Sequence, residues 1–243
     1  MSLQVNVMPS EARKEDKRFL KLKNHKDLFN PNSGAVVMVF GATGSGKTSW
    51  LWSYLNDWTP KLYDECIIFS GTADSNDTWE KLKQNNVIVL NSYDDAKFRT
   101  YLHDLEQEQD ERRKSNKDEL KVAVVFDDFV CDKISNLGKP TALDKLVLTS
   151  RHLQTTVFIL SQKYRGFLSP SVRKNAHYLV IYKMPISELK AIGEEHGDGY
   201  ENADEFAKVC NRIVGNRYEY MVVETRNPPE KRYRNGMTER LIF

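Results

Sequence analysis

The chain has 243 residues, of which 40% are hydrophobic and 29% charged, a composition typical of a soluble protein with one sizeable α/β domain. Its 36 basic and 34 acidic residues leave a formal net charge of +2. This balance excludes a uniformly basic nucleic-acid-binding surface, so any such contact must come from local clusters. The cysteines Cys66, Cys131 and Cys210 form no CxxC pair, which argues against a zinc site or a disulfide framework and favours a reducing compartment.

The first segment, residues 1–33, is polar and rich in Lys and Arg, and it runs into the turn-like sequence Asn-Pro-Asn-Ser-Gly. It predicts a basic arm that leads into the domain, with at most one short helix. It lacks the apolar core of a signal peptide, and no part of the chain approaches the roughly 18 apolar residues of a transmembrane helix. We therefore expect a protein inside a cell, with no membrane anchor of its own.

From residue 35 onward, short apolar runs alternate with helical stretches, which predicts a mostly parallel sheet flanked by helices. The predicted strands are residues 35–40, 65–70, 86–90, 120–126, 155–161, 178–182 and 218–224. The predicted helices are residues 47–58, 94–115, 141–152, 170–175, 186–195 and 202–214. Together these elements form one domain, residues 34–225, which is followed by a basic tail, residues 226–243.

The sequence Gly-Ala-Thr-Gly-Ser-Gly-Lys-Thr between the first strand and the first helix fits the P-loop pattern GxxxxGK[ST]. Its glycines allow backbone angles that aim several N–H groups at one anion, and the following helix N-terminus adds partial positive charge. We expect Lys47 to reach the β- and γ-phosphates of ATP and the Thr48 hydroxyl to hold Mg²⁺. The predicted nucleotide-binding residues are Gly41, Ala42, Thr43, Gly44, Ser45, Gly46, Lys47, Thr48 and Ser49.

Two adjacent acids, Asp127 and Asp128, follow the buried strand at residues 120–126. A P-loop enzyme needs an acidic residue at the end of a neighbouring strand to complete the Mg²⁺ shell, and we assign this role to Asp127. Asp128 is the candidate for polarising the attacking water, a group that hydrolysing motors have and P-loop kinases lack. Without the P-loop, the same pattern would fit a strand end followed by a helix cap equally well.

The segment between Lys47 and Asp127 contains two further strands. A strand inserted between the phosphate strand and the acidic strand is typical of the additional-strand, catalytic-acid branch of P-loop enzymes, the RecA/FtsK-like type. In the kinase and GTPase branch the two strands are neighbours. The next strand ends in Ser161 and Gln162, where a polar side chain can sense the γ-phosphate. The alternative for Gln162 is an ordinary loop residue.

An arginine on the transferring phosphate can contribute about 10³ to 10⁵ in rate. The candidates are Arg151, at the end of the helix before the sensor strand, and then Arg165 and Arg173. We favour Arg151, although a surface arginine at a helix C-terminus is stabilised by the helix dipole alone. If the arginine acts on a neighbouring subunit, the enzyme must be an oligomeric ring.

Three segments together resemble the viral genome-packaging ATPases of the FtsK–HerA superfamily: GATGSGKT, VAVVFDDFV and SRHLQTTVFILSQKYRGFLSPSVRKNAHYLVIYK. The resemblance extends over residues 35–225 and is strongest to the poxvirus-type ATPases of large nucleocytoplasmic DNA viruses and virophages. Many superfamily members have Asp-Glu at the second motif, whereas this chain has Asp127 and Asp128.

The resemblance implies an ATP- and Mg²⁺-dependent ring motor, a pentamer or hexamer, that threads double-stranded DNA into a preformed capsid. Its implied partners are the DNA and viral capsid proteins, and its implied location is the viral factory in the host cytoplasm, the virion, or both. By the same resemblance, Lys47 and Thr48 bind phosphate and Mg²⁺, Asp127 is the second-motif acid and Gln162 is the sensor.

A translocating ring needs basic side chains that hold DNA phosphates without reading sequence. One candidate group follows the sensor strand and the other lies in the C-terminal tail, and for both the alternative is a solubilising surface. The candidates are Lys163, Arg165, Arg173, Lys174, Lys231, Arg232 and Arg234.

Two other functions remain open from the residues. A small-molecule P-loop kinase would carry a substrate-binding insert and an arginine-rich lid, and neither is recognisable. A nucleotide-switched assembly factor would bind ATP but hardly hydrolyse it, which the presence of Asp128 and Gln162 disfavours.

Overall fold

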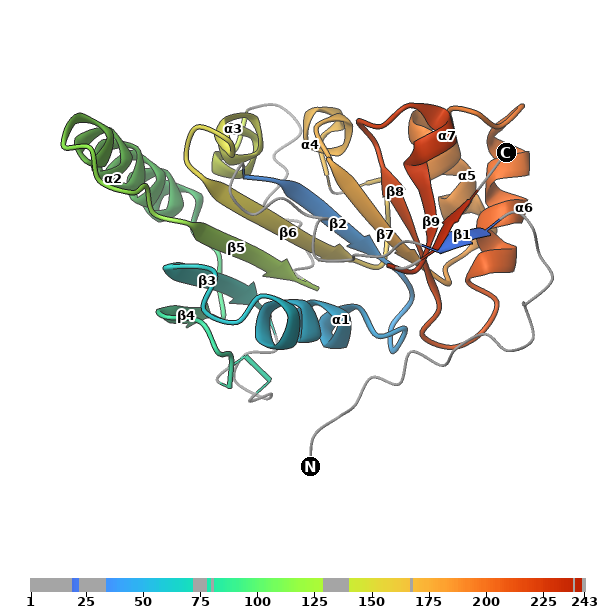
Figure 1. Ribbon diagram of the computed structural model, residues 1–243, viewed down its shortest axis with the longest axis horizontal. Coiled ribbons are helices and arrows are strands. Elements are labelled where there is room, and N and C mark those ends of the chain that lie inside the picture. The colour runs from blue at the N-terminus through green and yellow to red at the C-terminus, as the bar shows by residue number, and fades with distance from the viewer. Residues whose placement is uncertain are drawn as a thin grey trace.

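The computed structural model describes residues 19–21, 34–71, 78–79, 81–128, 140–166, 168–237 and 239–241. Its centre is one sheet of ten strands in the order β1-β10-β9-β8-β7-β2-β6-β5-β3-β4 (Figure 1). The strands are β1 (Phe19–Lys21), β2 (Val36–Phe40), β3 (Glu65–Ser70), β4 (Val87–Leu90), β5 (Val122–Asp127), β6 (Thr155–Ser161), β7 (Tyr178–Tyr182), β8 (Tyr220–Glu224), β9 (Tyr233–Asn235) and β10 (Glu239–Leu241).

Six neighbouring strands run parallel to one another: β7, β2, β6, β5, β3 and β4. Beyond β7 the sheet continues with antiparallel pairs, through β8, β9, β10 and β1. The helices are α1 (Lys47–Ser53), continued by the π-helical turn η2 (Tyr54–Trp58), α2 (Asp95–Lys114), α3 (Ala142–Thr149), α4 (Pro170–Lys174), α5 (Ile186–His196), α6 (Ala203–Ile213) and α7 (Pro229–Arg232). None of the helices in the described ranges is long and apolar enough to cross a bilayer.

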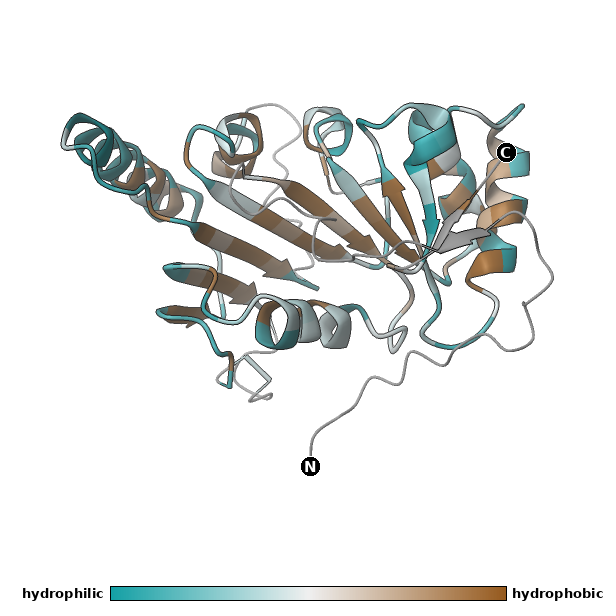
Figure 2. Cartoon of the chain, viewed as in Figure 1, coloured by the Kyte–Doolittle hydropathy of each residue, from teal (hydrophilic) through white to brown (hydrophobic). Residues whose placement is uncertain are grey.

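The central strands are buried on both faces, as continuous apolar runs predict for a parallel sheet covered on two sides. Alternate residues of β2 enter two cores: Met38 and Phe40 pack under α2 to α6, whereas Val37 and Val39 pack against α1. Figure 2 shows the hydrophobic colour concentrated in these strands and the hydrophilic colour at the outer end of α2. Helices α2, α3, α4 and α6 begin at side-chain caps; Asp94 before α2, for example, accepts hydrogen bonds from two backbone N–H groups.

Strand β6 lies between the phosphate strand β2 and the acidic strand β5. The sequence-based expectation of an additional-strand enzyme is therefore confirmed, although the inserted strand comes from later in the chain, and β3 and β4 lie outside β5. The register pairs Phe40 with Ser161 and Asp127 with Leu160. Because these strands are parallel, the residues that follow β2, β5 and β6 emerge together at the carboxyl edge of the sheet.

The expected basic tail is wrong as a description of residues 226–243, because α7, β9 and β10 lie within it and both strands belong to the sheet. β9 pairs with β8, and β10 pairs with β1 from the expected N-terminal arm. The rest of that arm, residues 1–18 and 22–33, lies outside the described residues. Cys131 also lies outside them, while Cys66 and Cys210 are buried free thiols.

Candidate active site

The phosphate loop follows β2 directly and is fixed to both neighbouring strands. The backbone N–H of Gly41 donates to Ser161 O over 3.1 Å, and that of Ala42 donates to Lys183 O over 3.0 Å. Gly46 has φ +103° and begins α1, and a Cβ added there would lie 2.9 Å from the Tyr218 ring. Glycine is favoured at this position, because L side chains rarely adopt this backbone angle and a Cβ would also displace the Tyr218 ring.

Lys47 is buried at the first turn of α1, where its ammonium group faces the loop. Its Nζ donates to Gly41 O over 3.0 Å and to Ala42 O over 3.3 Å. The same nitrogen lies 3.7 Å from Asp128 Oδ1. The lysine is thus held between the phosphate loop and the second acid, at the position that the P-loop pattern predicts.

Asp127, at the end of β5, contacts the first helix and one aromatic side chain. Thr48 Oγ1 donates to its Oδ1 over 3.0 Å, and Trp79 Nε1 donates to its Oδ2 over 3.3 Å. Burial, together with the nearby charge of Asp128, raises the pKa of Asp127 to about 6, against the opposing effects of the Thr48 and Trp79 hydrogen bonds and of Lys47. Trp79 was not predicted, since nothing in its local sequence signals a contact with β5.

The Thr48–Asp127 pair has the spacing of two Mg²⁺ ligands. Ligands at 2.0–2.1 Å in adjacent octahedral positions lie about 3.0 Å apart. The observed separation of Thr48 Oγ1 and Asp127 Oδ1 is 3.0 Å, and both atoms are the oxygen donors that Mg²⁺ prefers. Thr48 and Asp127 therefore fit the metal role predicted for them.

Asp128 turns to the other side of β5, toward Lys47 and Gln162. Its φ is +43°, an angle that non-glycine residues rarely adopt, and its Oδ1 is buried with no hydrogen-bond partner in the described part of the chain. Gln162 Nε2 approaches its Oδ2 at 3.5 Å from the end of β6. Strain at a reactive group is common at functional sites, and here it directs a carboxylate to the phosphate loop.

A cavity of about 240 Å³ adjoins the phosphate loop on the side away from Asp127. Its walls are residues 42–45, the end of β7 with Tyr182 and Lys183, and the loop of residues 215–219 before β8. Tyr218 in this loop has φ +70°, is 53% exposed and lies beneath the Arg217 guanidinium at 4.8 Å. These residues were not predicted, because their proximity to the loop depends on the antiparallel strand β8.

Arg151 lies at the opposite edge of the sheet from the phosphate loop. It follows α3 in the turn that leads into β6, and β6 then runs seven residues to the carboxyl edge, about 20 Å away. Its Nη2 lies 3.4 Å from His177 Nε2 at the start of β7. Arg151 is therefore placed away from Lys47 of its own chain, so it does not contact the phosphate loop of the same copy.

The other arginine candidates have partners within the chain. Arg173 is buried, its Nη2 donates to Glu195 Oε1 over 2.8 Å, and its guanidinium lies 5.3 Å from the Tyr164 ring centroid. Arg165 is exposed and forms an ion pair with Glu194 at 2.5 Å. The expectation that Arg173 contacts DNA or a phosphate is thus corrected: its charge is neutralised in the interior, where an unpaired guanidinium would be costly.

The basic residues expected to contact DNA do not form two clusters. Arg234 is buried against Glu224, and Arg232 is paired with Asp198, which corrects the expectation that both are free for DNA. The remaining lysines are exposed, and none has an acidic partner in the described ranges: Lys163, Lys174 and Lys231. Lys163 follows β6 at the carboxyl edge, whereas Lys174 precedes β7 at the amino edge, because α4 carries the chain back across the sheet.

Comparison with known proteins gives a family and a fold. Residues 18–217 match the family model described as the poxvirus A32 protein. No curated protein matches the chain in sequence. Genome packaging NTPase B204 of Sulfolobus turreted icosahedral virus 2, in complex with ATP-γ-S, is 20% identical with a TM-score of 0.53, covering 81% of this chain and 94% of B204.

Two further solved structures share the fold. The pCW3 conjugation coupling protein TcpA with ATP-γ-S is 17% identical with a TM-score of 0.59, covering 88% of this chain and 62% of TcpA. EssC (ATPases 2 and 3) from Geobacillus thermodenitrificans is 13% identical with a TM-score of 0.54, covering 88% of this chain and 40% of that one. The predicted P-loop ATPase fold and the resemblance to poxvirus-type packaging ATPases are confirmed. Because the family model spans most of its length, the chain belongs to the family of the poxvirus A32 protein.

Proposed function

We propose that this chain is the ATP-hydrolysing motor that moves double-stranded viral DNA into a preformed capsid. The main support for the proposal is that three side chains lie together beside the phosphate loop: Lys47, Asp128 and Gln162. They lie at the carboxyl edge shared by three parallel strands. An acid next to the lysine is suited to activating a water molecule. A P-loop kinase does not need such a group, because its nucleophile is the substrate. The family membership and the fold shared with the genome packaging NTPase B204 support packaging as the purpose of the hydrolysis.

Thr48 and Asp127 would hold Mg²⁺, since their oxygens have the spacing of adjacent ligands. The ion held by these two residues would supply positive charge that offsets the negative charge developing on the phosphates. Lys47 orients the phosphates, and Asp128 accepts the proton of the attacking water. Gln162, which contacts Asp128 at 3.5 Å, couples the position of that carboxylate to the presence of the γ-phosphate.

The nucleoside of ATP would occupy the cavity beside the phosphate loop. The cavity of about 240 Å³ opens next to residues 42–45 of the phosphate loop, on the side opposite the metal pair. The exposed ring of Tyr218 offers a flat face for the base. The backbone strain at Tyr218 is consistent with a side chain held in place for binding.

Arg151 would act on the ATP of a neighbouring copy in a ring of five or six subunits. Its position at the amino edge excludes contact with the phosphate loop of its own chain. The side chain is exposed, so it can contact another molecule. Mixing Lys47→Ala with Arg151→Ala tests this arrangement, because each variant alone is inactive. Copies with Lys47→Ala supply the arginine to intact sites of Arg151→Ala copies, so activity returns on mixing. Inactive mixtures in which native mass spectrometry shows mixed rings would refute the trans role.

The DNA contacts would come from Lys163, Lys174 and Lys231, with Arg165 as a weaker candidate because of its ion pair with Glu194. Contacts with phosphates release counterions, so replacing one such lysine by alanine should reduce the slope of log K against log salt by about 1 for each subunit whose lysine contacts the DNA. Lys190, which pairs with Asp204 on the surface, provides a matched control. A lysine variant with the wild-type slope does not contact DNA.

The decisive experiment measures ATP hydrolysis with and without long double-stranded DNA. Wild type should be stimulated by DNA, Lys47→Ala should lose ATP binding, and Asp128→Asn should bind ATP but turn over slowly. Absent DNA stimulation at every salt concentration, together with phosphorylation of an added nucleoside monophosphate, would support a kinase instead. Tight ATP binding with no turnover under any condition would support a nucleotide-switched assembly factor.

We further propose that the protein works in the viral factory of the host cytoplasm, in the virion, or in both, with capsid proteins as partners. Family membership supports this setting. Fractionation of purified virions and infected cytoplasm, with detection of the chain in each, tests the location. Crosslinking in assembling particles tests the capsid contact, and crosslinks confined to other copies of the chain would contradict it.

A further inference from the structure

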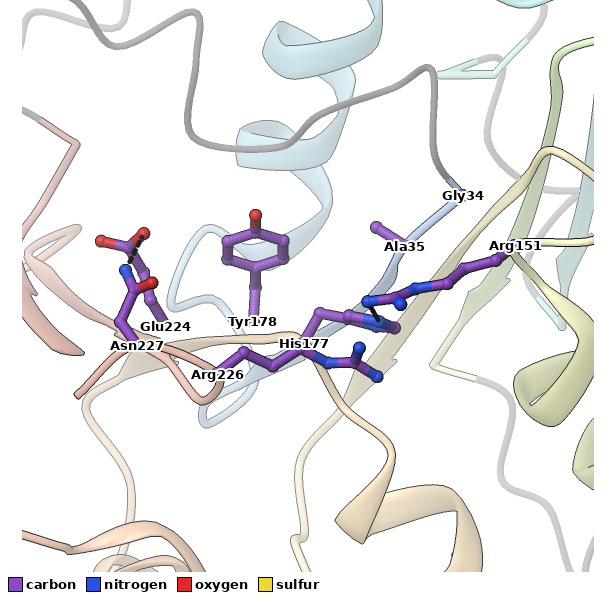
Figure 3. A pocket seen from close by; sticks show the side chains of 8 residues that line it. All are labelled: Gly34, Ala35, Arg151, His177, Tyr178, Glu224, Arg226 and Asn227. Atoms are coloured by element: carbon purple, nitrogen blue, oxygen red, sulfur yellow. Dashed lines mark hydrogen bonds between the residues drawn. The ribbon is translucent and has the colours of Figure 1, made fainter. Parts of the chain in front are cut away.

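A second cavity, of about 110 Å³, lies at the amino edge of the sheet, across the domain from the phosphate loop. It is lined by Gly34, Ala35, Arg151, His177, Tyr178, Glu224, Arg226 and Asn227. In Figure 3 the Arg151 and Arg226 side chains approach the His177 ring from two different elements. Arg151 comes from the turn before β6, and Arg226 follows β8. The cavity therefore gathers cationic groups at the beginning of the central strands.

His177 is fixed to the first residue of β2 by a pair of hydrogen bonds. Its backbone N–H donates to Val36 O over 2.8 Å, and the Val36 N–H donates to His177 Nδ1 over 2.9 Å. Since Nδ1 accepts, the ring proton must be on Nε2. Burial and the charges of Arg226 and Arg151 lower the pKa of His177 to about 4, so this neutral form persists at neutral pH.

The groups that face one another in the cavity are all hydrogen-bond donors. Arg151 Nη2 lies 3.4 Å from His177 Nε2, although both atoms carry protons. Arg151 and Arg226 line the same cavity, and burial and the charge of Arg151 lower the pKa of Arg226. Within the described ranges neither guanidinium has an acidic partner. An acceptor with negative charge is what these three donors lack.

The acid in the wall of the cavity does not supply this acceptor. Arg234 Nε donates to Glu224 Oε1, and Asn227 Nδ2 donates to Glu224 Oε2 over 2.8 Å, so both carboxylate oxygens have donors. Figure 3 shows Glu224 and Asn227 together, on the far side of Tyr178 from Arg151. The positive charge of Arg151 and Arg226 is therefore left for a group from outside the chain.

We propose that Arg151, Arg226 and the Nε2–H of His177 form a binding site for a phosphate group. Two guanidinium forks and one N–H match the several acceptor oxygens and the double charge of a terminal phosphate better than a single carboxylate. Both arginines are exposed, so the phosphate can arrive from solution or on another molecule. Arg226 and His177 are the residues this site adds to Arg151.

The phosphate has two sources that the same chemistry would accept. It can be dissolved inorganic phosphate, or it can be the terminal phosphate of ATP held by a second copy of the chain. Only the second source rests on the ring arrangement proposed above. The site itself needs no ring and can be tested on the isolated chain.

The first experiment titrates the full chain with inorganic phosphate while observing the Nε2 resonance of ¹⁵N-labelled His177. One of 5 histidines must be assigned, and a His177→Gln spectrum identifies it. We expect a saturable shift in wild type and in Arg212→Gln, a control that removes an exposed arginine elsewhere. Arg226→Gln should weaken phosphate binding about tenfold or more, and Arg226→Lys should weaken it less.

Three results would overturn the site. The first is no saturable shift of His177 with phosphate. The second is an unchanged affinity in folded Arg226→Gln, with folding checked by circular dichroism. The third is a shift with double-stranded DNA but none with phosphate, which would assign the cavity to the DNA backbone.

A second experiment distinguishes the sources. Labelled Lys47→Ala copies, which have lost their own ATP site, are mixed with unlabelled wild type and ATP-γ-S in phosphate-free buffer. A His177 shift that requires the unlabelled copy shows that a neighbour delivers the phosphate. If only inorganic phosphate shifts His177, the site stands with a dissolved ligand, and it is the trans arrangement of the proposed motor that fails.

Discussion

Replacing Asp127 by asparagine should make the metal-free protein more stable above pH 6. Burial raises the pKa of Asp127 from 3.8 to about 6, which corresponds to about 3 kcal/mol of stability lost when the group is ionised in the folded state. Asparagine removes this cost and can still accept the Thr48 hydrogen bond. Its amide cannot also accept from Trp79, and losing that bond costs about 1 kcal/mol. The expected net gain is about 2 kcal/mol.

The sign of the pH dependence follows from the raised pKa. A folded carboxyl with a pKa above its unfolded value binds more protons than the unfolded chain between pH 3.8 and about 6. The stability contribution of the wild-type group is therefore complete below pH 3.8 and is lost as the pH rises through 6. The advantage of Asp127→Asn should be full at pH 8 and should shrink steadily toward pH 4.

Urea unfolding in EDTA from pH 4 to pH 8 measures this difference directly. Thr48→Val provides a matched control, since it removes the partner hydroxyl and leaves the carboxyl in place. With Mg²⁺ and ADP the order should reverse, because ligand binding stabilises only the wild type. An Asp127→Asn protein that is less stable at pH 8 without metal, or a difference that does not change with pH, would refute the reasoning.

Three further outcomes follow from the geometry. Asp128→Asn should lower kcat by a factor of about 10² to 10⁴, while the affinity for ATP stays within a few-fold of wild type. Single-turnover hydrolysis and equilibrium binding measure the two effects. Normal turnover would show that Asp128 has no catalytic role. Gly46→Ala should weaken ATP binding, because alanine rarely adopts the φ of +103° that the loop requires here. Tyr218→Ala should instead raise KM without lowering kcat, a split that steady-state kinetics resolves. Arg173→Ala should lower the free energy of unfolding by about 3 kcal/mol, because it removes a buried guanidinium that is paired with the half-buried Glu195 and bonded to the Leu168 carbonyl. Lys174→Ala should change it by less than about 0.5 kcal/mol, and equal effects in urea unfolding would contradict the burial argument.

Much of the candidate site at the carboxyl edge of the sheet could be predicted from the sequence, because it depends on short local patterns. The glycine pattern before Lys47 and the acids after β5 each follow a continuous apolar run, and parallel strands place such ends side by side. The sequence could not give the order of the strands, which depends on pairing between distant segments. The position of β6 between β2 and β5 is such a case.

The C-terminal strands could not be predicted because their sequence is that of a solvated surface. Residues 229–241 are rich in charge, and β9 and β10 have three residues each. Arg234 is buried because Glu224 on β8 neutralises it, and Tyr233 is buried because its hydroxyl donates to the backbone carbonyls of His196 and Asp198. Neither partner can be read from the local pattern of polar and apolar residues.

Strand β2 has a binding group at each of its ends. Val36 holds the His177 ring at the amino edge, and the residue after Phe40 begins the phosphate loop. The strand is five residues long and fully buried, so it cannot shift at one end without disturbing the packing of the whole strand. If the trans role of Arg151 and the phosphate site at His177 both hold, the amino end of β2 would contact the nucleotide of a neighbouring subunit. The carboxyl end of the same strand would then transmit that contact to the subunit's own ATP site. Hydrolysis would then proceed from one subunit to the next around the ring, and one buried strand in each copy would set the order of hydrolysis.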